Sequence, residues 1–269
     1  GLFGVVKGEV KNLTLKDSYM KGRTMVAGLV CYAEGTTIIN NCHNKSTIDG
    51  VGCASGILGQ AFGNNSKDVT ITINQCTNEG LVVASNACGI VYYCIGAVDI
   101  LNCCNKGMVA TTRTSDFQYG RIAGICGFAQ GDYMHLHIMN CMNCGTVVGG
   151  AGIVNTINNR WAPQDKNLQY VYNCVNYGNT REAAIAYSIK DYAVVCANYY
   201  LETSSAKCYV TSQSKIINNN IEMTEKEMKA VTFLQTLNQN ASSFARMTQT
   251  TLNGWTTGED GFPILDWMK

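Results

Sequence analysis

The sequence predicts an all-β fold: a right-handed, parallel β-helix-like solenoid of about seven coils with a small helical and irregular cap at its C-terminal end. Two short phrases alternate along the chain, and apolar runs such as "VTITINQC" alternate with a period of two residues. One such unit cannot bury its apolar face alone, so stacked units must share a continuous core. A β-sandwich or a propeller would also use short strands, but fixed phrases at a loose spacing favour the solenoid.

The first phrase has a cysteine at its centre and an asparagine two residues later, as in "INQCTNEGLVV". We expect Ile73 and Cys76 to point inward, Asn78 to form a bend and Gly80 to release the next strand. Three residues before the cysteine stand Ile39, Ile73, Ile100, Ile138, Val171 and Ala193. The copies predict a cysteine ladder of Cys42, Cys76, Cys103, Cys141, Cys174 and Cys196, and an asparagine ladder of Asn44, Asn78, Asn105, Asn143, Asn176 and Asn198.

Both columns have a chemical alternative. Zinc sites use close thiolate pairs, and the only such spacings are Cys141 with Cys144 and the adjacent Cys103 and Cys104. A small apolar thiol packs readily in a core, so buried free cysteines are favoured over disulfides, and disulfides over metal. Six amides in a row could line a sugar-binding face, but a structural ladder of stacked, hydrogen-bonded amides is favoured.

A second phrase alternates with the first. Its copies are "AGLVCY", "SGILGQ", "CGIVYY", "AGICGF" and "AGIVNT", followed by a decayed copy, "AAIAYS", that begins at Ala183. The opening "GLFG" matches this phrase, and the segment after it places Leu13 in the cysteine column. We therefore expect the sequence to begin inside a repeat and any export signal to lie upstream of it.

The repeats stop near Tyr199, so we predict a solenoid over residues 1–198 and a strand-and-helix cap over residues 199–269. The segment "MTEKEMKAVTFLQTLNQ" predicts a helix with Thr224 as its N-cap and Glu227 completing a capping box. A solenoid needs cover at its open end, where strand edges are unpaired. Apolar cover would come from Trp255, Phe262, Ile264, Leu265 and Trp267.

The opening "GLFGVVKGEVKNLTLKDSYMKG" resembles the GLUG-type repeat of bacterial surface proteins, in which Gly-Leu-apolar-Gly precedes a V-x-N-L-x-L strand. The recurring N-C-x-N-x-G-x-V phrase is similar to repeats in large exported proteins of gut anaerobes. The segment from "CANYYLETSSAKCYV" to "GWTTGEDGFPILDW" resembles the ending of such arrays. This resemblance implies an extracellular or cell-surface, adhesin-like repeat protein with further domains in the same chain. The chain departs from the pattern at "AAIAYS" and in the segment 156–170.

Composition excludes some partners. Charged residues make up 14% of the chain and the net charge is +1, which gives no electrostatic case for nucleic acid. No apolar run approaches the roughly 20 residues of a membrane-spanning helix, so we expect no membrane insertion by this segment.

Catalytic and metal signals are sparse. His135 and His137 would project from one face of a strand, but no third histidine lies near them in sequence, and His43 would approach only if the coils aligned. We therefore predict no metal, no cofactor and no catalytic residue. The alternative function is a carbohydrate-active β-helix enzyme, either a polysaccharide lyase or a glycoside hydrolase, which needs carboxylates converging on one groove.

The sequence thus favours a non-enzymatic surface module that binds a host glycan or protein, or that acts as a spacer. Aromatic residues that escape the repeat are the candidate contacts, because exposed rings stack on sugars and anchor proteins, although ordinary coil packing is their alternative role. Trp161, in the segment 156–170, is the first candidate because long loops on solenoids often contain functional residues. The candidate binding residues are Trp161, Phe117, Tyr119, Tyr133 and Tyr177.

Overall fold

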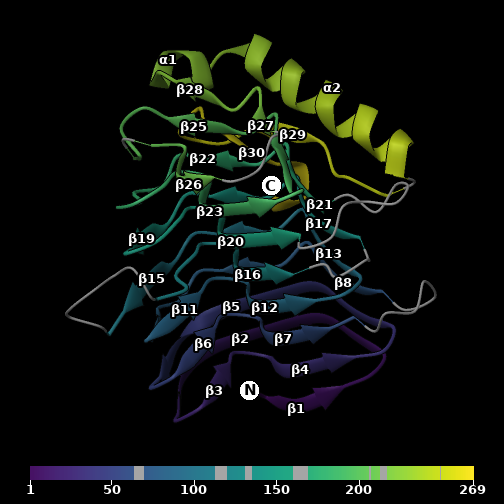
Figure 1. Ribbon diagram of the computed structural model, residues 1–269, viewed down its shortest axis with the longest axis vertical. Helices are drawn as coiled ribbons and strands as arrows, with labels where there is room; N and C mark the ends of the chain where they lie inside the picture. The colour runs from purple at the N-terminus through teal and green to yellow at the C-terminus, as the bar shows by residue number, and fades with distance from the viewer. Residues whose placement is uncertain are drawn as a thin grey trace.

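Parallel strands stack from one end of the molecule to the other in the computed structural model, which describes residues 1–63, 70–112, 120–130, 135–159, 169–205, 207–212, 217–248 and 250–269 (Figure 1). An eight-stranded sheet pairs in chain order, one strand from each successive turn, and all its pairings are parallel. Its strands are β1 (Phe3–Val6), β4 (Val30–Glu34), β7 (Leu58–Phe62), β12 (Val91–Ile95), β16 (Cys126–Gln130), β20 (Val154–Asn159), β23 (Ala186–Asp191) and β26 (Tyr209–Ser212).

A second, larger sheet carries the cysteine phrase of every turn, in one long strand or in two or three short ones. Its strands are β2 (Glu9–Gly22), β5 (Thr37–Gly50), β8 (Ile71–Asn74), β9 (Thr77–Asn78), β10 (Val82–Ala84), β13 (Val98–Leu101), β14 (Cys104–Asn105), β15 (Met108–Thr111), β17 (Leu136–Met139), β18 (Met142–Asn143), β19 (Thr146–Val148), β21 (Gln169–Tyr172), β22 (Val175–Asn176), β24 (Val194–Cys196), β25 (Tyr199–Leu201), β27 (Ile217–Asn218) and β28 (Ile221–Met223). A third sheet pairs β3 (Met25–Ala27), β6 (Cys53–Ser55) and β11 (Asn86–Cys88). The predicted all-β class with parallel strands is confirmed, and this strand order fits a β-helix.

The core is built from columns of identical or similar side chains. Ile39, Ile73, Ile100 and Ile138 are neighbours on successive strands, and all four are fully buried. Burial of one such side chain stabilises the fold by roughly 1.5–3 kcal/mol. Leu13 pairs with Cys42 and so lies at the head of the cysteine column, as predicted.

The predicted columns are wrong in the sixth copy. Tyr172 pairs with Cys196 and Asn176 pairs with Tyr200, so the register carries Asn198 opposite Cys174. The Cys174 amide N–H accordingly donates to Asn198 Oδ1 at 3.0 Å. In the isoleucine column, the residue is Val195 rather than Ala193. The repeat alignment placed Cys196 opposite Cys174 because both are cysteines. The strand pairing instead places Asn198 there, two residues further along the chain.

Five asparagines form a continuous ladder of amides through the interior. In the first four, Nδ2 donates to Oδ1 of the asparagine on the next turn, at distances of 2.7–2.8 Å, and the last, Asn176, donates to the hydroxyl of Ser204 at 3.3 Å. The same group also donates to the carbonyl two residues ahead, from Asn44 to Ser46 and from Asn105 to Gly107, both at 3.2 Å. The ladder residues Asn44, Asn78, Asn105, Asn143 and Asn176 are fully buried. Their amides are satisfied by one another, as buried polar groups require.

The bend does not lie where the sequence predicted it. The left-handed residue is the one immediately before the cysteine column, whether a cysteine or another residue such as Leu13 or Asn198 fills that column, and not the asparagine two residues after it. Asparagine occupies most of these positions because it tolerates a positive φ better than other residues with a side chain. The left-handed residues of successive turns are Asn12, Asn41, Gln75, Asn102, Asn140, Asn173, Ala197 and Asn219, with φ between 52° and 56°.

A glycine from the second phrase lies against each ladder asparagine. A Cβ on Gly89 would stand 2.2 Å from the Gly124 carbonyl oxygen and 2.5 Å from Asn105 Oδ1, so no larger residue fits. The decayed copy "AAIAYS" shows the same match between the residue at the glycine position and the residue at the ladder position. Where Tyr200 replaces the ladder asparagine, Ala184 replaces the glycine, and both join the apolar core. The cysteine-asparagine phrase and the glycine phrase therefore form two surfaces of each turn that pack against each other.

The column thiols are buried and free. Cys76 Sγ donates to the Asn74 carbonyl at 3.2 Å, and Cys103 Sγ donates to the Leu101 carbonyl at 3.1 Å. Burial raises the pKa of Cys76, Cys103 and Cys141 well above the ordinary value, because a thiolate would lose its hydration. These sulfurs serve as packing atoms and weak donors rather than as nucleophiles.

The C-terminal segment packs on the side of the solenoid as well as at its end (Figure 1). It contains α1 (Glu225–Met228), α2 (Val231–Thr248), β29 (Trp255–Thr257), β30 (Pro263–Leu265) and the 3₁₀ helix η2 (Asp266–Met268). The Thr224–Glu227 capping box is present, although the predicted helix is divided between α1 and α2. Parallel pairing continues through Met223, beyond the boundary expected at residue 198. No described helix has the length and apolar character to cross a membrane.

The ladder makes a direct prediction for stability. We expect Asn105→Ala to lower the free energy of unfolding by roughly 3 kcal/mol, because it leaves an amide hydrogen of Asn78 and Oδ1 of Asn143 buried without their partners. Urea denaturation followed by circular dichroism measures the change. The matched control is Asn218→Ala on an exposed strand position, which should cost less than about 0.5 kcal/mol. Equal losses in the two variants would contradict the role assigned to the ladder.

Candidate functional site

The predicted aromatic contacts are only partly within the described residues. Trp161, Phe117, Tyr119 and Tyr133 lie outside them. Tyr177 is half-buried, and its ring stacks on Phe262 of the C-terminal segment with centroids 4.6 Å apart. Tyr177 is therefore a contact between the solenoid and its cap, the packing alternative considered above.

The outer face of the large sheet changes character along its length. One outward column is polar where the chain begins and apolar where the C-terminal segment covers it. In order, its members are Thr14, His43, Thr77, Cys104, Met142, Val175 and Tyr199. From Cys104 onward the column packs against Phe233, Leu237, Trp255 and Leu265 of the cap. The cap therefore covers the apolar part, and the polar part lies beside it, with Thr14 exposed, His43 half-buried and Thr77 buried.

Left-handed asparagines fix the cap in place. The Asn253 amide N–H donates to Asn102 Oδ1 at 2.9 Å, and Asn140 Nδ2 donates to the Asn253 carbonyl at 2.9 Å. The indole N–H of Trp255 donates to Asn140 Oδ1 at 2.6 Å. Asn173 Nδ2 donates to a backbone carbonyl of α2 at 3.1 Å. The residues that bend each turn thus also dock the C-terminal segment, and β30 then leads into η2 and Trp267.

A groove lies at the boundary between covered and open surface. Its volume is about 350 Å³, and the ring of Trp267 from η2 stacks over that of His43 from β5, with centroids 6.1 Å apart. We call it the Trp267 groove. Its lining residues are Thr14, Lys16, Asn41, His43, Lys45, Thr77, Glu79, Lys106, Trp267 and Met268.

The Trp267 groove is cationic. Lys16, Lys45 and Lys106 are exposed along it, and the carboxylate of Glu79 pairs with Lys45 at 3.2 Å. His43 is held by Thr77 Oγ1 at 2.8 Å and Asn41 Oδ1 at 3.0 Å. Burial lowers the His43 pKa, so the ring stays neutral near pH 7. The groove therefore presents excess positive charge beside an aromatic face.

Sequence reasoning missed this site although a signal existed. Lys45 and Lys106 each follow a ladder asparagine directly, and Lys16 is the register partner of Lys45. The repeat alignment therefore already placed these lysines in one column. That Trp267 returns to the same column depends on the docking of the cap, which the repeat pattern does not encode.

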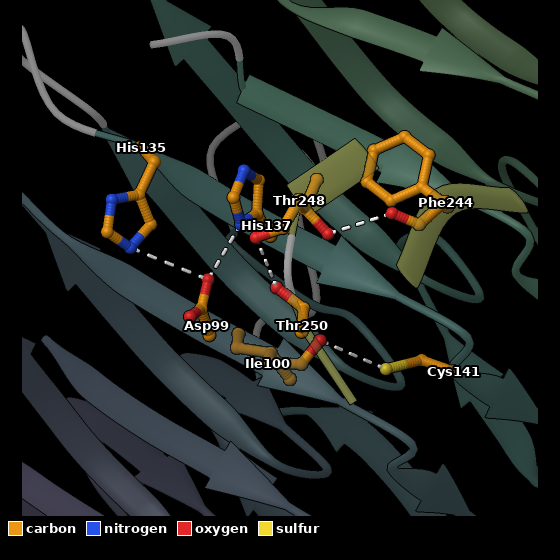
Figure 2. Close-up of polar contacts among 8 residues, drawn as sticks. All are labelled: Asp99, Ile100, His135, His137, Cys141, Phe244, Thr248 and Thr250. Carbon is orange, nitrogen blue, oxygen red and sulfur yellow. Dashed lines mark hydrogen bonds and ion pairs between the residues drawn. The ribbon is translucent and has the colours of Figure 1, made fainter. Parts of the chain in front are cut away.

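The two strand histidines meet a carboxylate from the neighbouring turn (Figure 2). His137 on β17 pairs with Asp99 on β13, and His135 lies two residues earlier on the same face. Asp99 Oδ1 is 2.8 Å from His137 Nδ1 and 3.6 Å from His135 Nε2. Burial lowers the His135 pKa, which keeps its ring neutral near pH 7. His43 lies in the Trp267 groove and is not part of this cluster.

One thiol differs from the column cysteines. Cys144 is half-buried at the edge of the cap, and its pKa is lowered by a hydrogen bond from Cys104 and by the positive charge of Lys106. Burial instead raises the pKa of Cys196 to about 11 and that of Cys208 to about 12. Cys144 is thus the most acidic of these three half-buried thiols.

We expect Cys144 to be alkylated before Cys196 and Cys208 when the folded protein meets iodoacetamide at pH 8. The reagent attacks the thiolate, and a lower pKa gives a larger thiolate fraction at that pH. Peptide mass spectrometry with light and heavy reagent gives the order. Lys106→Ala should slow the alkylation of Cys144 and leave Cys208 unchanged. Faster reaction of Cys196 or Cys208 would contradict the assigned pKa order.

No protein-family model matches the chain, so membership of a GLUG-type family remains an expectation. Over an alignment of 155 residues the chain is 28% identical to an immunoglobulin A1 protease of Streptococcus sanguinis, and the match covers 53% of this chain and 8% of that protein. The chain also resembles a crystal structure from Bacteroides ovatus, provisionally assigned as an immunoglobulin A1 protease, with a TM-score of 0.55 and 17% identity. That match covers 97% of this chain and 76% of the solved one, and it supports the fold alone.

Proposed function

We propose that the chain is a non-enzymatic module of an exported cell-surface protein that binds an acidic carbohydrate in the Trp267 groove. The observation that carries the proposal is the combination of one aromatic face with three exposed lysines in that groove. The right-handed winding and about seven coils expected from the repeats belong to the same proposal. The extracellular location rests on the resemblance of the repeats to those of surface proteins.

The chemistry of the groove fits a sugar acid. An indole ring offers a flat apolar surface for the C–H face of a pyranose, while ammonium groups attract carboxylate or sulfate substituents. Thr77, Asn41 and Glu79 add hydroxyl, amide and carboxylate groups that can orient sugar hydroxyls.

A carbohydrate-active enzyme is the alternative. Glycosidases use two carboxylates that flank the scissile bond. Among the described lining residues, Glu79 is the one carboxylate, and Lys45 neutralises it. The groove therefore favours binding over hydrolysis.

The names of the similar proteins favour a second candidate, a role within an immunoglobulin A1 protease. The matched stretch is 8% of the Streptococcus protein, so this chain would be an accessory segment of such an enzyme. In that case its partner would be a host protein rather than a glycan.

Binding measurements test the proposal. We expect oligogalacturonate to bind the chain in isothermal titration calorimetry more tightly than a neutral dextran oligosaccharide of similar length. Lys45→Ala combined with Lys106→Ala should weaken binding roughly tenfold at low salt, because two cationic contacts are lost. Trp267→Ala should also weaken binding through loss of the stacking surface, with circular dichroism used to check the fold.

The matched control is Lys190→Ala on β23, an exposed lysine outside the groove, which should bind like the parent chain. Equal affinity for neutral and acidic oligosaccharides would contradict the groove assignment. Release of reducing or unsaturated sugar ends during incubation would favour the enzyme alternative. Cleavage of immunoglobulin A1 by this chain would favour the protease instead.

A further inference from the structure

We propose that Asp99, His135 and His137 bind one divalent transition-metal ion, with zinc as the representative, on the outer face of the large sheet. The three donor atoms lie within 4.8 Å of one another and come from two adjacent turns of the solenoid. The inference is independent of the Trp267 groove.

The donor geometry requires little movement to accept an ion. Zinc binds imidazole nitrogen and carboxylate oxygen at about 2.0–2.2 Å, so tetrahedral ligands stand roughly 3.3 Å apart. The observed separations from Asp99 Oδ1 are 2.8 Å to His137 Nδ1 and 3.6 Å to His135 Nε2, one on either side of that value. Both histidine rings approach the same carboxylate oxygen (Figure 2), so small side-chain rotations would open space for the ion between them.

The donor set fits borderline metals. Two imidazoles and one carboxylate match the ligands of catalytic zinc and of related divalent sites, and three protein ligands leave one position for water or another ligand. Calcium and magnesium prefer oxygen ligands, so they fit this set poorly.

The surroundings support the site. Side-chain exposure is 15% for Asp99, 27% for His135 and 11% for His137, so the cluster is partly desolvated yet reachable from solvent. The His135 and His137 rings stack with centroids 5.0 Å apart, and the Tyr170 ring lies 5.7 Å from that of His137. Phe244 of α2 packs edge-on against Tyr170, so the cap supports one wall. Such packing restricts the histidine rotamers and preorganises the donors.

The cluster is also a break in the repeat. The outward column that contains Asp99 and His137 has Glu9, Ile38 and Thr72 before them and Tyr170 and Val194 after them. In this column, Asp99 and His137 are potential ligands on adjacent turns, whereas the other described carboxylate, Glu9, is separated from them by Ile38 and Thr72. A structural column would instead repeat one residue type, as the ladder asparagines do. An ion here would link β13 to β17.

Cobalt and zinc titrations of the whole chain test the site. We expect one equivalent of Co²⁺ to give visible d–d bands typical of nitrogen and oxygen ligands, without the strong near-ultraviolet charge-transfer band of thiolate ligands. Zinc should displace the cobalt, and calorimetry should give one site per chain. His135→Gln combined with His137→Gln should weaken zinc binding by roughly 100-fold or more, because two of three ligands are lost.

The matched control is His43→Ala, which removes the third histidine and should leave zinc affinity unchanged. If the double variant misfolds by circular dichroism, His135→Gln alone serves, because His135 precedes β17 and is the most exposed ligand. Unchanged zinc affinity in the histidine variants would overturn the proposal. A thiolate charge-transfer band with one equivalent of cobalt would also overturn it and would assign the metal to cysteines.

Discussion

The buried asparagine ladder is the constraint on which the rest of the fold depends. An amide in the dry interior must have its hydrogens and its oxygen satisfied, and here the partner is the same amide one turn away. A slip of one residue would break every rung and turn each side chain to the other face of its strand. The ladder therefore fixes the phase of the five turns that it joins, and the glycine facing each rung follows from it because a Cβ on Gly89 would meet Asn105.

Because the ladder fixes the phase, outward residues also fall into columns, and the composition of each column decides what the surface can do. The stretch from Cys104 to Tyr199 is apolar, and it receives the C-terminal segment. The left-handed asparagines provide hydrogen bonds for the same docking, through Asn102 and Asn140 to Asn253. Asparagine thus has two roles at these positions: it allows a positive φ within the turn, and its side-chain amide forms hydrogen bonds with the cap. Trp267 reaches His43 because this docking carries the chain back along the outer face.

Much of the fold could be predicted from sequence because the interior repeats chemically. The cysteine column from Cys42 to Cys174 and the column that contains Ile39 follow from similar residues at matching positions of the repeat. The prediction failed at Cys196 and Asn198. There the repeat alignment paired a cysteine with a cysteine, whereas the strand pairing places Asn198 opposite Cys174, and Tyr200 stands where an asparagine would have marked the correct alignment. The Thr224 capping box is local and could be predicted, whereas side docking depends on hydrogen bonds between residues about 150 positions apart. Asp99 could not be assigned to His137 because 38 residues separate them.

Variable spacing between the rungs explains how such a fold acquires distinctive surfaces. Successive ladder asparagines are separated by 34, 27, 38 and 33 residues, yet their amide hydrogen bonds stay between 2.7 and 2.8 Å. Differences in turn length therefore lie in segments outside the ladder, and they do not change the spacing of the ladder amides. Outward positions carry no such restriction, so a lysine can follow Asn44 where a tyrosine follows Asn176. The Trp267 groove and the Asp99 cluster both occupy these unrestricted positions. In a repeat protein of this kind, distinctive chemistry can arise on the outer columns at little cost to the interior, since the residues that hold the turns together are not those that face solvent.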